Sequence, residues 1–175
     1  MKVWHIVGID PGLVHTGVVR LDIGDGELIN SHTVVKGIDA AAVAAWIGNR
    51  EDHPDKIFIE KYDPRMHFSS DERMVKGEAA LRSSLKRYTQ VEFIKNRDIK
   101  QAVPLVTLNM MGLWNFPTVT HHQDLRSAAR IAVMGMMRTP SLNLVLADMM
   151  RDALDGNPWP VTDLGGGVSL ASVAD

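Results

Sequence analysis

The chain has 175 residues, of which 45% are hydrophobic and 23% are charged, as in ordinary soluble domains. It contains no cysteine, which excludes a disulfide framework, a cysteine-bound metal centre and a thiol nucleophile. The formal net charge is -2, yet residues 61–104 hold ten Lys and Arg against six Asp and Glu. A basic middle in an otherwise acidic chain is typical of a nucleic-acid contact surface or of a solvated helical face.

The N-terminal part of the chain predicts three strands in succession. Residues 3–9 form an apolar run that ends in the turn sequence Asp10-Pro11-Gly12. Strands over residues 17–22 and 27–35 follow, separated by a loop of glycine and aspartate that favours a hairpin. The apolar run is too short for a signal peptide or a membrane span. We therefore expect an intracellular protein without a membrane partner.

Helices and strands alternate in the rest of the chain. Asp39 is the predicted N-cap of a helix over residues 40–48, and a short buried strand follows over residues 56–60. The later predictions are an amphipathic helix over 71–88, a strand over 91–94, a short helix over 97–103, a loop over 104–117 and helices over 121–138 and 141–154. This order predicts an α/β fold in which helices cover a mixed sheet.

The domain organisation follows from the same pattern. We expect one domain over residues 1–155. Prolines and glycines dominate the remainder of the chain, so we expect a flexible tail over residues 156–175.

Acidic residues end two of the predicted strands. Asp10 ends the first strand and Glu60 ends the fourth. If these strands are neighbours, both carboxylates emerge at one edge of the sheet, where Gly8, Gly12 and Gly17 let the backbone approach a large polar ligand. Mg²⁺ usually binds one or two carboxylates together with substrate phosphate. The pair predicts half of a phosphoryl-transfer site; the alternatives are a turn cap at Asp10 and a salt bridge from Glu60 to a basic neighbour such as Lys61.

A further acidic residue lies near the start of the helix predicted over residues 121–138. His121, Asp124 and Ala128 have helical spacing, so His121 and Asp124 share one face while the small residues after them turn toward the sheet. The alternatives are that Asp124 is an ordinary helix cap and that His121 is a surface residue.

Taken in order, these motifs resemble the RuvC-type Holliday junction resolvases, a family with the RNase H-like (retroviral-integrase-like) fold. The motifs are Gly8-Ile9-Asp10-Pro11-Gly12 with Thr16-Gly17, the strand ending at Glu60, the basic run at 98–103, and His121-x-x-Asp124 before an alanine-rich helix. The resemblance covers residues 3–137. It implies a five-stranded mixed sheet, three antiparallel strands and then parallel ones, with helices on both faces. The small size and the divergent middle resemble phage-encoded members more than bacterial ones.

The resemblance also implies a metal-dependent nuclease site. The matching ligand positions are Asp10, Glu60, His121 and Asp124, which would hold two Mg²⁺ ions, or Mn²⁺ in their place. Such ions activate a water for attack on the scissile phosphorus and neutralise the leaving 3′ oxygen. Lys100 matches a lysine near the scissile phosphate. In an alternative register, Asp124 takes the third ligand position and Ser127 the fourth, which leaves the fourth position without a carboxylate.

Aromatic and basic residues predict how DNA is bound. Tyr62 and Phe68 follow Glu60 where the family places an aromatic wedge, while Trp114 and Phe116 either pack in the core or stack on an opened base. The candidate phosphate contacts are Arg82, Lys86, Arg87, Lys95, Arg97 and Lys100.

A homodimer is the expected assembly. The helix over residues 71–88 resembles the family helix that packs between subunits, with Gly77 allowing close approach. Symmetric cleavage of two strands of a four-way junction also requires two sites related by a two-fold axis.

The leading hypothesis is a structure-selective endonuclease for branched DNA, with four-way junctions as substrates and forks and flaps as further candidates. One alternative is a catalytically inert junction-binding protein. Another is an actin-like nucleotide-binding protein, because the Gly-Ile-Asp-Pro-Gly and Thr-Gly motifs also resemble that class. Such proteins need a second similar domain, which 175 residues do not supply.

Overall fold

The computed structural model describes residues 2–63, 71–95, 97, 99–116, 120 and 122–166. Its strands are β1 (Trp4–Asp10), β2 (His15–Gly24), β3 (Glu27–Lys36), β4 (Lys56–Lys61), β5 (Val91–Lys95) and β6 (Val161–Asp163). Its helices are α1 (Ala40–Gly48), α2 (Glu72–Leu85), α3 (Ile99–Ala102), α4 (Leu105–Met110), α5 (His122–Arg138) and α6 (Pro140–Leu154). None of the helices in these ranges is both long and apolar enough to cross a bilayer.

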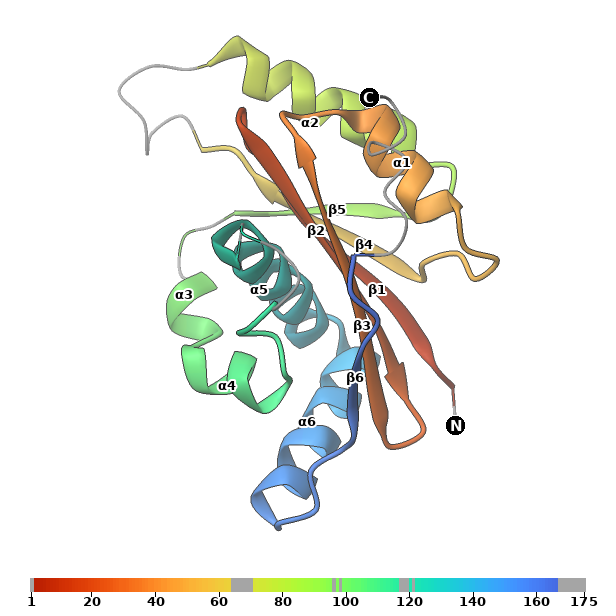
Figure 1. Ribbon diagram of the computed structural model, residues 1–175, viewed down its shortest axis with the longest axis vertical. Helices are drawn as coiled ribbons and strands as arrows, with labels where there is room; N and C mark the ends of the chain where they lie inside the picture. Colours follow the sequence, from red (N-terminus) through yellow and green to blue (C-terminus); the bar gives the residue numbers. More distant parts are fainter. Residues whose placement is uncertain are drawn as a thin grey trace.

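The strands form one mixed sheet in the order β5-β4-β1-β2-β3-β6. Strands β1, β2 and β3 are antiparallel neighbours, whereas β4 runs parallel to β1 and β5 runs parallel to β4. Helices α1 and α2 cover one face, and α3 to α6 lie on the other (Figure 1). The predicted α/β fold, with its antiparallel and parallel strands and helices on both faces, is confirmed.

The strands alternate their side chains between two apolar layers. Val7 and Ile9 of β1 pack with α1 and α2 on one face, and Ile6 packs with α5 and α6 on the other. Phe58 of β4 belongs to the second layer and is fully buried. Both faces of the central strands are therefore buried, and polar side chains at strand ends are the ones left near solvent.

Helix α5 packs unusually close to the sheet because glycines lie beneath it. A side chain at Gly8 on β1 would collide with the backbone oxygen of Ala128, and one at Gly17 on β2 would collide with the backbone oxygen of Asp124. The prediction that Gly8 and Gly17 make room for a polar ligand is therefore wrong. They make room for α5, and this contact fixes where its first turns lie.

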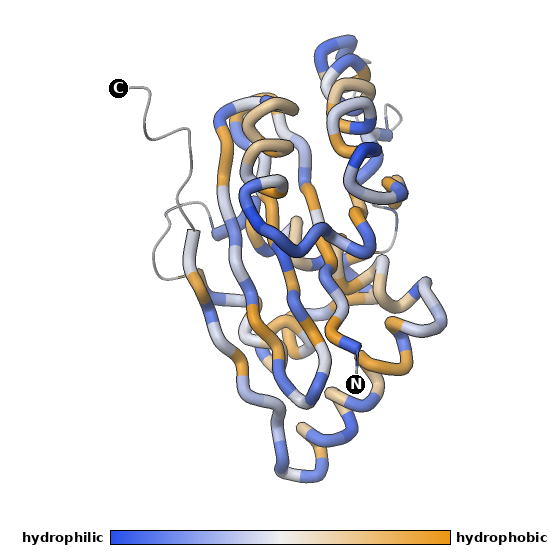
Figure 2. The backbone as a smooth tube through the Cα atoms, turned by 90° about the vertical axis from the view of Figure 1, so that its right-hand side faces the viewer, coloured by the Kyte–Doolittle hydropathy of each residue, from blue (hydrophilic) through white to orange (hydrophobic). Residues whose placement is uncertain are grey.

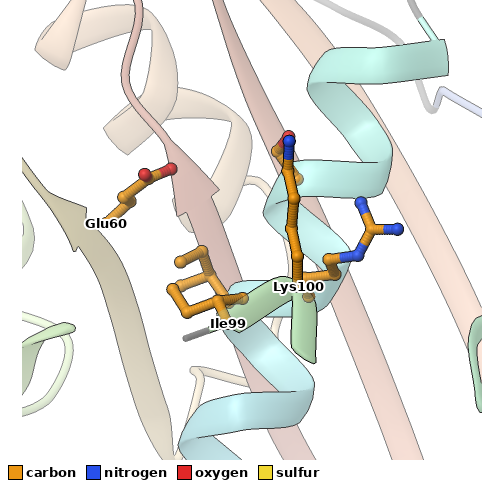
Figure 3. Close-up of a pocket in the computed structure, with 6 residues that line it drawn as sticks. Glu60, Ile99 and Lys100 are labelled. Atoms are coloured by element: carbon orange, nitrogen blue, oxygen red, sulfur yellow. The ribbon is translucent and has the colours of Figure 1, made fainter. Parts of the chain in front are cut away.

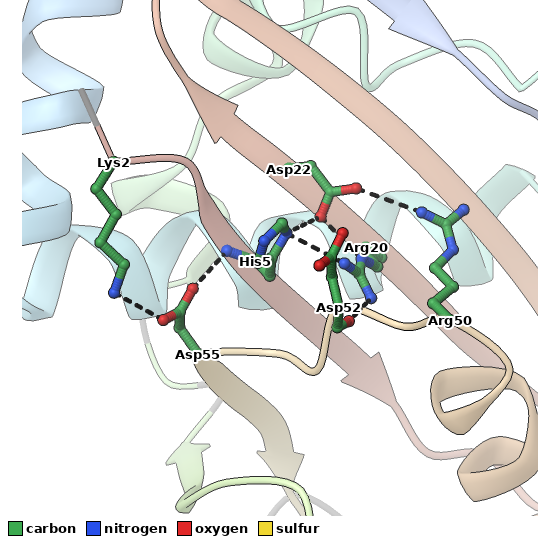
Figure 4. Close-up of polar contacts among 7 residues, drawn as sticks. All are labelled: Lys2, His5, Arg20, Asp22, Arg50, Asp52 and Asp55. Carbon is green, nitrogen blue, oxygen red and sulfur yellow. Dashed lines mark hydrogen bonds and ion pairs between the residues drawn. The ribbon is translucent and has the colours of Figure 1, made fainter.

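A charged network fixes the connection between α1 and β4 (Figure 4). The fully buried Arg20 donates from Nε to Asp22 at 2.8 Å and from Nη1 to the backbone oxygen of Asp52 at 2.7 Å. The carboxylate of Asp55 accepts from the backbone N–H of His5 at 2.9 Å. The network ties the start of β4 to β1 and β2, and so holds β4 in register with β1.

The segment predicted as a loop over residues 104–117 contains a helix, α4. Pro104 precedes it, and its Leu108 is buried together with Met111, Leu113 and Phe116. The prediction of a loop throughout is therefore wrong. Burial of apolar side chains stabilises this single helical segment, which is too short to show a clear helical period in the sequence.

The sheet has six strands, so the expected number of five is wrong by one. Residues 161–163, within the predicted tail, form β6 and pair in parallel with β3 at the sheet edge (Figures 1 and 2). All three β6 side chains are exposed. Backbone hydrogen bonds hold the segment instead, including Leu28 N–H to Pro160 O at 3.0 Å and Leu164 N–H to Asn30 O at 2.8 Å.

Gly77 on α2 faces the interior of the protomer. A side chain there would collide with the side chain of Ile38. The expectation that Gly77 allows close approach of a second subunit is therefore wrong, since its close neighbour belongs to the same chain.

Candidate active site

Asp10 and Glu60 lie at the same edge of the sheet because β1 and β4 are neighbouring parallel strands. The register pairs Ile9 with Ile59, so the residue after each of them emerges at the carboxyl end of its strand. A hydrogen bond joins the Asp10 and Glu60 carboxyl groups. The sequence predicted this juxtaposition, and the structure confirms it.

Helix α5 brings two more side chains to this pair. The hydroxyl of Ser127 donates a hydrogen bond to the Asp10 carboxylate, and the negative charge of Asp124 acts on the same group. Asp124 and Ser127 are three positions apart, so they lie on one face of the helix. These are the two residues that the alternative register names. His121 of the first register lies outside the described residues.

Burial and like charges keep Asp10 protonated. Removal from water raises the pKa of its carboxyl group to about 9, and the hydrogen bond and charge of Glu60 and the charge of Asp124 act in the same direction. The hydrogen bond from Ser127 acts against them. At neutral pH the Asp10 carboxyl group therefore keeps its proton.

The oxygen donors at this edge fit a divalent cation. Two adjacent carboxyl groups mark a position where a cation is stabilised, and Mg²⁺ and Mn²⁺ prefer carboxylate oxygen. In the part of the chain that the structure describes, no three His, Asp or Glu side chains form a ready-made metal site. The carboxyl pair is thus the core of the candidate site, and Asp124 and His121 stay predictions as further ligands.

A small pocket opens beside the carboxyl pair. It is lined by Glu60, Ile99, Lys100, Ser127, Arg130 and Ile131. Figure 3 shows Glu60 reaching toward it from β4 and Lys100 from α3. The pocket therefore combines an acidic wall, which suits a cation, with two basic side chains that suit a phosphate.

Three of the predicted phosphate contacts lie toward this edge. Lys100 lines the pocket. Lys95 ends β5 in register with Lys61, next to Glu60, and is exposed. Arg97 follows two residues later and is also exposed. These side chains can meet a backbone that passes the carboxyl pair.

The other three lie farther away, on or just after α2. Lys86 and Arg87 precede Thr89, whose hydroxyl donates to the backbone oxygen of Asp55 at 2.9 Å, just before the start of β4. That position is about 17 Å from Glu60 along the strand, at roughly 3.3 Å per residue. Arg82 stacks on the ring of Phe93 at 4.5 Å in the middle of β5. Contacts from Lys86 and Arg87 would therefore fall on a different stretch of DNA from those of Lys100.

Tyr62, the predicted wedge residue, is tied to α2. Its hydroxyl accepts a hydrogen bond from the backbone N–H of Asp71 at 3.1 Å, and its own backbone N–H donates to Glu78. These bonds hold Tyr62 at the start of α2, and its side chain is only partly buried. The other predicted wedge residue, Phe68, lies outside the described residues.

Sequence reasoning missed two arginines near the pocket and left two aromatic residues open. Arg126 and Arg130 are four residues apart on α5, so a paired basic face was visible in the spacing. Trp114 lies against both guanidinium groups, whereas Phe116 is fully buried in the core. Core packing is thus the outcome for Phe116. Trp114 is partly buried: it packs against the same core and also lies against the two guanidinium groups.

Solved structures with a similar fold include resolvases from a bacterium and from yeast. Thermus thermophilus RuvC in complex with a Holliday junction substrate has a TM-score of 0.57 and 19% identity, covering 78% of this chain and 97% of that chain. A second structure of the Thermus protein has a TM-score of 0.55 and 19% identity, covering 87% and 97%. The yeast mitochondrial Holliday junction resolvase has a TM-score of 0.50 and 13% identity, covering 87% and 86%.

No protein-family model matches the sequence, and no curated protein matches it. The similarity is therefore one of three-dimensional structure. It bears out the expectation drawn from the motifs: this chain has the RNase H-like fold of the RuvC-type Holliday junction resolvases.

Proposed function

We propose that this protein is a divalent-metal-dependent, structure-selective endonuclease that cleaves phosphodiester bonds in four-way junctions and other branched DNA. The observation that carries the proposal is the pair of carboxyl groups of Asp10 and Glu60, which the register of β1 and β4 brings together at the sheet edge, next to Lys100 and Arg130. The RNase H-like fold shared with RuvC supports it.

The residues at the edge have distinct roles in this proposal. Asp10, Glu60 and Asp124 are the carboxylates that would hold two Mg²⁺ or Mn²⁺ ions, with His121 or Ser127 completing the set. Such ions, when bound, lower the pKa of the attacking water and offset the charge on the leaving 3′ oxygen. Ser127 orients the Asp10 carboxylate through its hydrogen bond. Lys100 contacts the scissile phosphate and stabilises the charge that develops on it.

We also propose that the protein works as a homodimer, because two cuts related by a two-fold axis need two sites. The outward face of α2 offers a surface for it: Val75 is 55% exposed, and Ala79, Ala80 and Ser83 beside it are small and exposed. Val75→Asp should convert the dimer to a monomer in sedimentation experiments. A wild-type protein that sediments as a monomer even with junction DNA would contradict the dimer.

The nuclease proposal is tested with a labelled four-way junction and a linear duplex of matched sequence. We expect paired nicks in the junction that require Mg²⁺ or Mn²⁺, disappear with chelator and are lost in Asp10→Asn and Glu60→Gln. Glu51→Gln is the matched control, because Glu51 is exposed in the turn between α1 and β4.

The other outcomes are equally informative. Junction binding without nicks under either metal would indicate an inert junction-binding protein. Equal cutting of the duplex would indicate a general nuclease. Forks and flaps, tested in the same assay, show how far the substrate range extends.

A further inference from the structure

A second cluster lies next to the pocket and is built from Trp114, Arg126 and Arg130. The guanidinium carbon of Arg126 lies 3.7 Å from the centre of the Trp114 ring, and that of Arg130 lies 5.8 Å from it. Arg126 Nε donates to the backbone oxygen of Trp114 at 2.7 Å, and Arg130 Nε donates to that of Val103 at 3.2 Å. In each arginine, the hydrogen bond from Nε and the contact with the Trp114 ring therefore hold the guanidinium group in place.

The two cations are close together, and none of the carboxylates that the structure describes forms an ion pair with them. They are four residues apart on one helix, where side chains are neighbours, and burial together with the charge of Arg126 lowers the pKa of Arg130. Among the described residues, no Asp or Glu forms an ion pair with either one. Arg20, Arg50, Arg73 and Arg151, by contrast, each pair with an aspartate.

The remaining hydrogen-bond donors suit an anion. A guanidinium carries five N–H donors, and in each of these arginines only the one on Nε has a protein acceptor within the described residues. The four N–H donors on the terminal nitrogens form the planar fork that binds phosphate in bidentate fashion. Trp114 holds the two forks in place, and their positive charges repel each other. A phosphate that lies between or beside them offsets this repulsion.

The cluster continues the basic side of the pocket. Arg130 lines the pocket together with Lys100 and Glu60. Arg126 lies one helical turn before Arg130, on the same side of α5. Lys100, Arg130 and Arg126 therefore form one basic side of the site.

We propose that Arg126 and Arg130, positioned by Trp114, bind the DNA backbone at the phosphates next to the one that is cleaved. The inference rests on the proposed nuclease function, since it takes the cleaved strand as the ligand. The chemical class of the ligand is a nucleic-acid phosphodiester backbone, and Trp114 acts as the support of the two arginines.

The test compares charge-neutral variants at both ends of α5. Arg126→Gln/Arg130→Gln removes both forks. Arg138→Gln is the matched control, because Arg138 is exposed in the last turn of the same helix, about 18 Å from Arg126 at 1.5 Å per residue. Affinity for a four-way junction is measured by fluorescence anisotropy in chelator across a range of salt concentrations.

We expect the double variant to lose about tenfold or more in affinity at low salt. The slope of log K against log salt should fall by about two, close to one for each lost phosphate contact. The variant Arg126→Lys/Arg130→Lys, which keeps the charge and loses the fork, should retain most of the slope. Arg138→Gln should stay within about twofold of wild type.

Neutral methylphosphonates then locate the contact on the DNA. Placed one at a time beside the cleaved phosphate, a methylphosphonate should weaken binding of the wild type and leave the double variant unaffected. Equal weakening in both proteins, or a salt slope like that of Arg138→Gln, would overturn the assignment.

The result separates this inference from the proposed function. If the wild type binds and nicks the junction but the double variant keeps the full slope, only the arginine assignment fails. If the wild type binds without nicking, the nuclease proposal fails and the contact is decided by the slope and the methylphosphonates. If the wild type binds no DNA, both fail.

Discussion

The carboxyl groups of Asp10 and Glu60 are joined by a hydrogen bond across two neighbouring parallel strands. Two like-charged groups can make this contact only if one of them carries a proton. Burial raises the pKa of Asp10 to about 9 and thereby supplies that proton at neutral pH. The same arrangement makes the site unfavourable for the metal-free protein once both groups are ionised, and the first two predictions follow from this.

Asp10→Asn should stabilise the metal-free protein. Asp10 has a folded-state pKa of about 9 against a reference value of 3.8. In wild type, the stability that its protonated carboxyl group contributes to the folded state is therefore fully present below about pH 4 and is lost as the pH rises toward 9. An amide does not ionise and escapes this loss. We expect the melting temperature of Asp10→Asn in chelator at pH 8 to exceed that of wild type by on the order of 5 °C. The difference should shrink toward pH 4, and Glu51→Gln should show no such trend.

Metal binding should displace the proton of Asp10. Because Mg²⁺ or Mn²⁺ requires ionised ligands, binding near pH 7.5 should release about one proton. Isothermal titration calorimetry in two buffers of different ionisation enthalpy measures this number directly. Asp10→Asn should release none and bind at least tenfold more weakly. Proton release by Asp10→Asn equal to that of wild type would show that the proton comes from elsewhere.

The two ligand registers predict opposite results for two variants. If the alternative register is correct, Ser127→Ala lowers both metal affinity and junction cleavage, because Asp10 loses a hydrogen bond that stabilises its ionised form. His121→Ala then has little effect. If the first register is correct, His121→Ala abolishes cleavage and Ser127→Ala reduces it a few-fold. Cleavage rates of both variants, measured at saturating Mn²⁺ and again at limiting metal, decide between the registers.

Gly17→Ala should separate α5 from the sheet edge. The added methyl group would meet the backbone of Asp124, which cannot give way without moving the helix. We expect a stability loss of about 2 kcal/mol, in the range of overpacked cores, together with a loss of metal affinity. Gly166→Ala is the control, since its added methyl group meets only the backbone oxygen of His32 at 3.6 Å, which is an ordinary contact. Retention of full metal affinity by Gly17→Ala would show that α5 does not position the site.

His32 should make the protein sensitive to acid. It is fully buried on β3, its ring lies edge-on to Phe116 at 4.9 Å, and burial lowers its pKa below 6.5 despite the charge of Asp163. When a histidine is kept neutral in the folded state, the protein loses stability as the pH falls below the pKa of that histidine in the unfolded state. The loss is at most about 1.4 kcal/mol per pH unit. His32→Leu should remove this dependence between pH 6.5 and 5 in thermal melts. His53→Gln, at an exposed histidine, should leave it intact.

The strands and the carboxyl pair were predictable from the sequence because their signals are local. Uninterrupted apolar runs mark β1 and β4, and each ends in an acidic residue, so that one assumption about neighbouring strands placed Asp10 beside Glu60. Strand β6 gave no such signal. Its side chains are exposed and its pairing with β3 uses backbone groups, which every sequence possesses.

The details of α5 could not be predicted from spacing alone. Residues 121, 124 and 127 are each one helical turn apart, so either adjacent pair fits the same pattern. Asp124, whose backbone rests on Gly17, belongs to both registers, so the cleavage rates of the Ser127 and His121 variants decide the choice. The pairing of Arg126 and Arg130 with Trp114 likewise depends on how the chain returns after α4.

Strand β6 also bears on how copies of this protein avoid one another. Without it, β3 would be an outer strand with a row of unpaired N–H and C=O groups, a template for edge-to-edge aggregation. Residues 161–163 cover the backbone of Leu28, Ile29 and Asn30. At the opposite border, β5 carries charges, including the ion pair of Glu92 with Lys56 at 3.1 Å. The sheet thus ends on one side in a strand of only three residues, which offers little backbone for pairing, and on the other side in a strand that carries charge.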